Sequence, residues 1–149
     1  SYPTGHVARR QIAIFKEEGV DLGKVKIDHS NDTTDTEYLT WILDQGCFLG
    51  LDRYPGRLVS PHMRTVTLKR LMDMGYGERL CPSHDCICLH IHNEQPDGSI
   101  AEQHDFHKSN PDQYLFMHRH VIHQLHQLGA TDRDIEMLFV DNPRRLFEA

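Results

Sequence analysis

The sequence predicts an α/β fold in which short parallel strands alternate with helices. Three short apolar runs each stop on a charged or metal-capable side chain, and a helical pattern follows each run. The runs stop at His29, at Asp52 with Arg53, and at Asp85. Because the carboxyl ends of parallel strands converge on one face of a β/α repeat, side chains more than twenty positions apart can meet there. These observations predict both the fold class and the place of an active site.

The first part of the chain predicts a helix and then one strand-helix unit. Apolar residues at helical spacing predict a helix from about Val7 to Glu18, and Gly19 is a usual helix stop. A strand is predicted from Val25 to Asp28. The segment from Thr34 to Glu37 has the spacing of a capping box, so it predicts the start of a helix that closes at Gly46.

Two further strand-helix units are predicted in the middle of the chain. The run from Cys47 to Leu51 is continuously apolar, as expected for a parallel strand buried on both faces. Ser60 offers an N-cap and Pro61 stands at the first helical position, and the helical pattern then runs to Gly75. The third strand is the shorter run from Leu80 to Ser83.

The last third combines a long connection with a series of helices. About 25 residues separate Asp85 from the next helix signal at Asn110, and a connection of this length is more often a functional loop than an accident. Helices are predicted from Tyr114 to Leu128 and from Thr131 to about Phe139, and Asn142 starts a short terminal helix. A three-stranded parallel sheet whose first helix has no strand is an odd complete domain, so the pattern predicts a piece of a larger β/α array.

Composition limits the function classes. The chain has 149 residues, a formal net charge of −6 and scattered Lys and Arg residues, so no basic surface for nucleic acid is expected. No apolar stretch approaches the roughly 18 residues needed to span a bilayer, and no signal peptide is visible, so membrane binding is not expected. The number of histidines, twelve, favours a metal-binding function. The spacing of the four cysteines favours a reduced, cytoplasmic compartment over disulfides; they are Cys47, Cys81, Cys86 and Cys88.

The residues at the strand ends are the candidate site. A neutral imidazole at His29 can bind a divalent metal, and Asp32 can orient a group that hydrogen-bonds to a metal ligand; the alternative is a histidine that caps the following loop. A carboxylate at Asp85 can bind metal and accept a proton from a metal-bound water, as metal-assisted hydrolysis requires; the alternative is a helix or loop cap. Arg53 offers fixed donors for a carbonyl or phosphoryl oxygen, and the alternative is a surface ion pair.

Other histidines and cysteines give competing metal sites. In an extended segment, four candidate ligands from Cys86 to His92 share one face, but neighbours on that face lie about 6.5 to 7 Å apart, too far to close a zinc shell easily. A solvated helix face is favoured over a ligand set for the helical histidine stripe. The four candidate ligands are Cys86, Cys88, His90 and His92, the stripe is His120, His123 and His126, and His104 and His107 lie in the long loop.

Four segments match one family pattern in order and in spacing. They run from Lys26 to Thr33, from Gly50 to Tyr54, from Ser83 to Asp85 and from Val140 to Phe147. Together they resemble the phosphotriesterase family of the amidohydrolase superfamily, and the similarity runs almost end to end. The Asp-Arg-Tyr form looks closer to the phosphotriesterase-like lactonases than to the dedicated organophosphate hydrolases, which have histidine where this chain has Arg53.

The resemblance implies a TIM (β/α)₈ barrel that holds two divalent metal ions, commonly zinc, with iron, cobalt or manganese as alternatives. This chain, residues 1–149, would be the carboxyl-terminal part of one barrel domain, with about strands 6 to 8 and helices 5 to 8. His29 would bind the more exposed metal, and Asp85 would bind the more buried one and take the proton of the bridging hydroxide. Arg53 would line the substrate site, Asp32 would join a proton relay, and the loop that begins at Cys86 would shape the substrate pocket.

The implied activity is hydrolysis of lactones or related esters by a metal-bound hydroxide, with phosphotriesters as possible side substrates. A small-molecule substrate, a cytoplasmic location and a homodimer are expected. The family's paired histidines on strand one, its carboxylated lysine on strand four and its histidine on strand five have no counterpart here. The chain is therefore expected to be a fragment of a longer polypeptide and inactive by itself. The alternatives are a non-catalytic barrel fragment whose strand edges are covered by a partner or a second copy, and a structural zinc protein.

Overall fold

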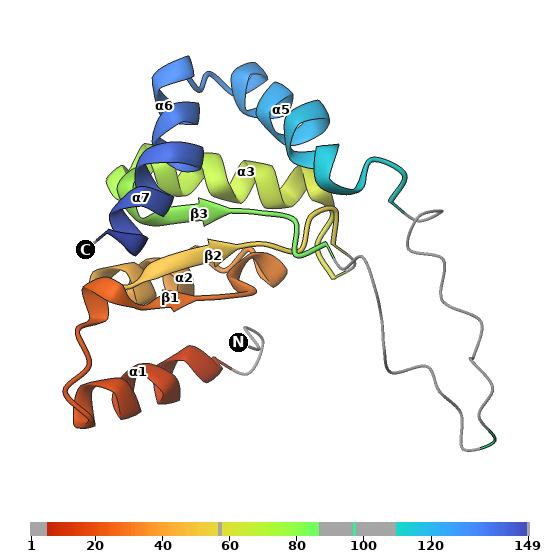
Figure 1. The fold of residues 1–149 in the computed structure, drawn as a ribbon. Helices are drawn as coiled ribbons and strands as arrows, with labels where there is room; N and C mark the ends of the chain where they lie inside the picture. Colours follow the sequence, from red (N-terminus) through yellow and green to blue (C-terminus); the bar gives the residue numbers. More distant parts are fainter. Residues whose placement is uncertain (1–5, 57, 87–96, 98–109, 149) are drawn as a thin grey trace.

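Three short parallel strands form the centre of the fold. They are β1 (Lys26–Ile27), β2 (Phe48–Leu51) and β3 (Leu80–Pro82), and they lie in the order β1-β2-β3. Lys26 is aligned with Phe48, and Leu49 with Leu80. All three arrows in Figure 1 point the same way, so the carboxyl ends lie at one edge of the sheet. The predicted parallel strands are confirmed, although each is one or two residues shorter than predicted.

Helices surround this sheet in the computed structural model, which describes residues 6–56, 58–86, 97 and 110–148. Figure 1 shows the first helix on the β1 side of the sheet and the last three helices on the β3 side. Within the described residues, no helix has both the length and the apolar character needed to cross a bilayer. The helices are α1 (Val7–Glu17), α2 (Thr36–Asp44), α3 (Pro61–Leu71), α5 (Ile122–Gln127), α6 (Asp132–Glu136) and α7 (Asn142–Phe147).

Short helical turns complete the described backbone. Single 3₁₀ turns precede β1 and β3, and another follows β1 at the candidate site. Wider π turns extend α3 and precede α5 and α7. The 3₁₀ turns are Leu22–Lys24, Ser30–Asp32, Gly77–Arg79 and Gln113–Leu115, and the π turns are Met72–Tyr76, Met117–Val121 and Met137–Asp141.

Two helix starts follow the predicted caps and one does not. The Ser60 hydroxyl accepts a hydrogen bond from the Met63 amide at 3.3 Å, and Thr131 forms a capping box, so both predicted caps are confirmed. The predicted capping box that begins at Thr34 is wrong. Asp35 is the N-cap of α2, and its carboxylate accepts a hydrogen bond from the Tyr38 amide at 3.1 Å. An ionised carboxylate is a stronger acceptor than a hydroxyl, which favours the aspartate at this position.

The chain after α6 also differs from the prediction. A helix end near Phe139 and a new start at Asn142 were expected, but the backbone continues from α6 through the π turn Met137–Asp141 into α7. Pro143 lacks an amide hydrogen, and its ring would crowd the carbonyl four residues earlier in a regular α-helix. The wider π turn just before the proline gives the ring room while the helix goes on.

The core lies between the sheet and the helices. α2 packs on β2, and α3 lies against α2 and α5. Alternate residues Leu49 and Leu51 of β2 join this core, whereas Gly50 between them lies against Asp28 on the other face. A Cβ at Gly50 would overlap the Asp28 carboxylate and lie 2.9 Å from the Asp28 Cα, so only glycine fits. The helices contribute Ile12, Leu39, Ile42, Leu68, Leu71 and Leu125 to the core, and the π turn before α7 contributes Leu138.

Candidate active site

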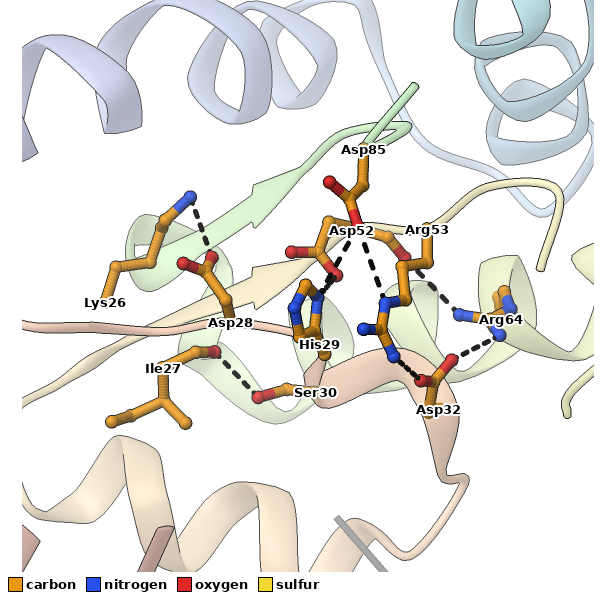
Figure 2. A network of polar contacts seen from close by, with 10 residues as sticks. All are labelled: Lys26, Ile27, Asp28, His29, Ser30, Asp32, Asp52, Arg53, Arg64 and Asp85. Atoms are coloured by element: carbon orange, nitrogen blue, oxygen red, sulfur yellow. Dashed lines mark hydrogen bonds and ion pairs between the residues drawn. The ribbon is translucent and has the colours of Figure 1, made fainter. Parts of the chain in front are cut away.

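The three strand-end residues share an uncommon backbone conformation. His29, Arg53 and Asp85 have φ values of 62°, 62° and 48°, in the left-handed region that few residues other than glycine adopt. Such conformations collect at functional sites, where surrounding contacts hold them in place. Figure 2 shows that the three side chains point toward one another. The predicted convergence of the strand ends is therefore present in the structure.

His29 is oriented by the carboxylate of Asp52. The His29 Nδ1 atom lies 3.0 Å from Asp52 Oδ1 and 3.9 Å from Asp85 Oδ2. A carboxylate beside Nδ1 favours the tautomer with the proton on that nitrogen, which leaves the Nε2 lone pair available. Among the described residues no hydrogen bond uses Nε2. The Nε2 atom of His29 therefore has the lone pair that a metal ligand requires.

Sequence reasoning missed Asp52 as the partner of His29 and expected Asp32 in an orienting role beside it. Burial raises the pKa of Asp52, and the hydrogen bond with His29 offsets only part of this effect. Asp52 was detectable in principle, because it stands at the carboxyl end of the strand next to the one that carries His29.

Arg53 connects Asp85 with Asp32. Its Nε atom lies 3.5 Å from Asp85 Oδ2, and its Nη1 atom donates a hydrogen bond to Asp32 Oδ2 at 2.8 Å. The Arg53 and Asp85 side chains are 43% and 41% exposed, so a small molecule can reach both. Arg53 and Asp85 are thus neighbours, as predicted, and the Arg53 guanidinium connects Asp32 with Asp85.

Arg64 of α3 lies under this group and was not found from the sequence. Its Nη2 donates to Asp32 Oδ1 at 2.6 Å, its Nη1 to the Asp52 carbonyl at 3.3 Å and its Nε to the Val59 carbonyl at 2.9 Å. Burial raises the pKa of Asp32, but the hydrogen bonds from Arg64 and Arg53 outweigh it and leave that pKa below its usual value. One signal was available, since Arg64 falls on the apolar face of its helix, four residues before Leu68.

His29 and Asp85 fit one side of a metal site. An imidazole nitrogen and a carboxylate oxygen are suitable ligands for zinc and similar divalent ions. Within the described ranges, no group of three or more His, Cys, Asp or Glu side chains is placed to hold a metal ion. The two residues therefore need further ligands that this part of the chain does not provide.

The competing sites lie only partly within the described residues. The Cys86 carbonyl accepts a hydrogen bond from the Tyr114 hydroxyl at 3.2 Å. Two histidines of the stripe contact residues close to them in sequence. His120 Nε2 lies 2.6 Å from Asp112 Oδ2, and His126 Nδ1 lies 3.0 Å from the Ala130 carbonyl oxygen. The stripe is exposed, as predicted for a solvated face. The predictions for Cys88, His90, His92, His104 and His107 lie outside the described residues.

Comparison with known proteins gives one consistent family. The model of the phosphotriesterase family matches residues 4–147. A phosphotriesterase homology protein of Mycobacterium tuberculosis is 36% identical over 141 residues, which are 93% of this chain and 40% of that protein. An aryldialkylphosphatase of Saccharolobus solfataricus is 34% identical over 92% of this chain and 42% of its own length. An N-acetyltaurine hydrolase of Dictyostelium discoideum is 28% identical over 91% of this chain.

A solved structure shows the same backbone arrangement. The phosphotriesterase from Mycobacterium tuberculosis superposes with a TM-score of 0.83 and 34% sequence identity, over 96% of this chain and 42% of that one. That structure is a TIM barrel, so the predicted partial barrel is confirmed. The chain spans about 40% of the length of the M. tuberculosis and S. solfataricus relatives that it matches.

Proposed function

This chain belongs to the phosphotriesterase family, and from that premise we propose that it forms part of a metal-dependent hydrolase of small-molecule lactones or esters. The supporting observation is the meeting of His29, Arg53 and Asp85 at the ends of three neighbouring strands. Phosphotriesters are a second substrate class, since one relative is named an aryldialkylphosphatase. A cytoplasmic location agrees with the free thiols of Cys47 and Cys81. A homodimer remains a prediction.

We propose two divalent metals, zinc or alternatively iron, cobalt or manganese, as cofactors. When bound, such ions polarise the substrate oxygen and lower the pKa of water. His29 through Nε2 and Asp85 through its carboxylate would hold them, together with ligands from outside this chain. Asp52 fixes the ring of His29 in the orientation that this role needs.

Three side chains of this chain would act on the substrate. Asp85 is the proton acceptor, because its carboxylate is exposed at the strand ends beside His29 and Arg53. Arg53 donates hydrogen bonds to the carbonyl or phosphoryl oxygen, for which its fixed guanidinium geometry is suited. Cys86 follows Asp85 directly and lines the start of the substrate pocket.

The proposal is tested on the full-length polypeptide, with metal content and hydrolysis measured together. The substrates are a γ-lactone, a δ-lactone, p-nitrophenyl acetate, diethyl p-nitrophenyl phosphate and an N-acyl taurine. We expect hydrolysis of at least one lactone or ester by the protein loaded with zinc, cobalt or manganese. We expect Asp85→Asn to lower kcat by about 100-fold or more, as for other residues that exchange protons in the reaction.

The control is Asp73→Asn, because Asp73 is an exposed aspartate of the π turn after α3. This variant should keep wild-type metal content and activity. Unchanged hydrolysis with unchanged metal content in Asp85→Asn would exclude the proposal. A metal-free protein that hydrolyses none of these substrates would instead favour the non-catalytic alternative.

A further inference from the structure

Arg64 is a buried charge that the proposed reaction does not use directly. Its side chain is fully buried, whereas arginine is among the residues least often buried completely. Removing a guanidinium from water is costly unless all of its donors are matched by acceptors. Here Nε, Nη1 and Nη2 each have an oxygen acceptor. These bonds use three of the five N–H donors of the guanidinium, one on each nitrogen, and the Asp32 carboxylate balances its charge, which suggests a role for it.

The turn after β2 is shaped around this guanidinium. Gly56 has a φ of +78°, and a Cβ at this position would overlap the Nε, Nη2 and Cζ atoms of Arg64. No other residue type leaves this space open without moving Arg64. The backbone that carries Arg53 three residues earlier is thus built against the Arg64 side chain.

The acceptors of Arg64 come from two strand ends. The Nη2 atom holds Asp32 in the turn after β1, and the Nη1 atom holds the peptide carbonyl of Asp52 at the end of β2. The two oxygens of Asp32 are divided, with Oδ1 facing the buried Arg64 and Oδ2 facing the exposed Arg53. Arg53 in turn reaches Asp85 with its Nε. A continuous chain of contacts leads from the interior to the substrate side.

We propose that Arg64 is a positioning residue that fixes Arg53 beside Asp85 by holding Asp32 and the Asp52 carbonyl. An exposed arginine has many rotamers, and ordering it when substrate binds would reduce affinity. The buried Arg64–Asp32 pair orders it in advance. This inference rests on the function proposed above. Affinity for the substrate oxygen then depends on two arginines, because Arg53 binds the oxygen and Arg64 positions Arg53.

The same contacts give Asp32 a role as an anchor in place of the proton relay that the family resemblance implies. The Arg53 guanidinium lies between Asp32 and Asp85. A guanidinium does not release protons in proteins, because its pKa lies far above the physiological range. The contacts through Arg53 thus fix the position of Asp85 relative to Asp32 electrostatically, and they do not carry a proton between the two carboxylates.

A double-mutant cycle tests the proposal in the full-length, metal-loaded polypeptide, with δ-valerolactone as the probe. Arg64→Lys keeps the charge but loses the planar guanidinium fork that makes the three hydrogen bonds. It should raise KM about tenfold and change kcat by less than about threefold, the pattern of lost substrate binding. Arg53→Met should raise KM by a similar factor. Because Arg64 acts through Arg53, the double variant should be no worse than Arg53→Met. The proposal would be overturned if the effects of the two substitutions on KM multiplied in the double variant. A loss of kcat at constant KM in Arg64→Lys would also overturn it.

A second measurement does not depend on activity. Phenylglyoxal modifies accessible arginines, and peptide mass spectrometry gives the modification rate of Arg53. This rate should rise at least threefold in Arg64→Lys and in Asp32→Asn, and it should stay at the wild-type value in Arg70→Lys, a substitution on the exposed face of the same helix. Equal rates in all four proteins would overturn the proposal.

The two measurements separate the two proposals. If the wild-type protein hydrolyses none of the substrates, the proposed function fails, and the modification rate of Arg53 alone decides whether Arg64 positions it. If Arg64→Lys does not fold, the folded Asp32→Asn variant decides, since it removes the charge that holds Arg53 and leaves Arg64 in place.

Discussion

Single residues at the strand ends combine strained backbone with stabilising contacts. A left-handed conformation costs about 1–2 kcal/mol for a residue with a Cβ. His29, Arg53 and Asp85 all adopt it, and each has an oppositely charged or hydrogen-bonding neighbour at the same site. Glycine would relieve the strain but would remove the side chain. We infer that the chemistry of these three side chains at this edge of the sheet outweighs the free-energy cost of their left-handed backbone.

The Asp52–His29 hydrogen bond gives the first prediction. Asp52→Asn keeps the size of the side chain but removes the charge that fixes the tautomer and orientation of His29. We expect the affinity of the full-length protein for zinc to fall about 10–100-fold, the usual cost of losing a carboxylate behind a metal-binding histidine. Competition with a chromophoric chelator measures the affinity, and Asp73→Asn is the control. Equal affinities for Asp52→Asn and wild type would show that Asp52 does not prepare His29.

Gly50 gives the second prediction, because its missing Cβ makes room for Asp28. Gly50→Ala forces Asp28 and the β1 backbone away and should lower the free energy of unfolding by about 2 kcal/mol, within the range for overpacking. Urea denaturation measures the change. Gly23→Ala is the matched control, since its added Cβ would meet only the end of the Asp21 side chain. A loss in Gly50→Ala no larger than in Gly23→Ala would contradict this account.

Elements with a local signal were predictable from the sequence. The helices α1 and α3 and all three strands have a signal in their own residues, such as apolar spacing, a glycine stop or a Ser-Pro start. The path from α6 to α7 has no such signal. Asn142 before a proline is typical of a helix start, and the contacts that its side chain makes with another element cannot be deduced from that local pattern.

The side chain of Asn142 joins α7 to the start of β3 and gives the third prediction. Its Nδ2 atom donates hydrogen bonds to the Gly77 and Leu80 carbonyls at 2.7 and 2.8 Å, and the residue is fully buried. Asn142→Ala leaves two buried carbonyls without these donors, so the free energy of unfolding should fall by about 2–3 kcal/mol. Urea denaturation checks this value. Asn142→Asp should not rescue the variant, because a carboxylate cannot donate both bonds.

At the scale of the whole molecule, the candidate site was only partly predictable because part of it depends on how the elements pack together. Parallel strands bring their carboxyl ends together in any β/α array, so the meeting of His29, Arg53 and Asp85 followed from their places in the sequence. The contacts of Arg64 with Asp32 and Asp52 depend instead on how α3 packs under two turns. Residue spacing carries no information on that packing, so the sequence predicted the residues that meet at the strand ends better than the residues that hold them.

The two buried aspartates of the site should give opposite dependences of stability on pH. The pKa of Asp32 is lowered from its ordinary value of 3.8, so its ionised form adds stability that is fully present above pH 4 and is lost as the pH falls through the lowered value. The pKa of Asp52 is raised, so its ionisation opposes folding once the pH rises above 3.8 and through the raised value.

Urea denaturation of the chelator-treated full-length protein between pH 3 and pH 7 tests this difference. Asp32→Asn breaks a buried ion pair and should cost about 3 kcal/mol at pH 7, with a smaller loss at pH 3. The stability of Asp52→Asn relative to wild type should move the other way and improve as the pH rises. If both variants showed the same pH slope, the two carboxyl groups would not differ as their surroundings require. Opposite slopes would show that Arg64 and Arg53 keep Asp32 ionised while burial works against the charge on Asp52.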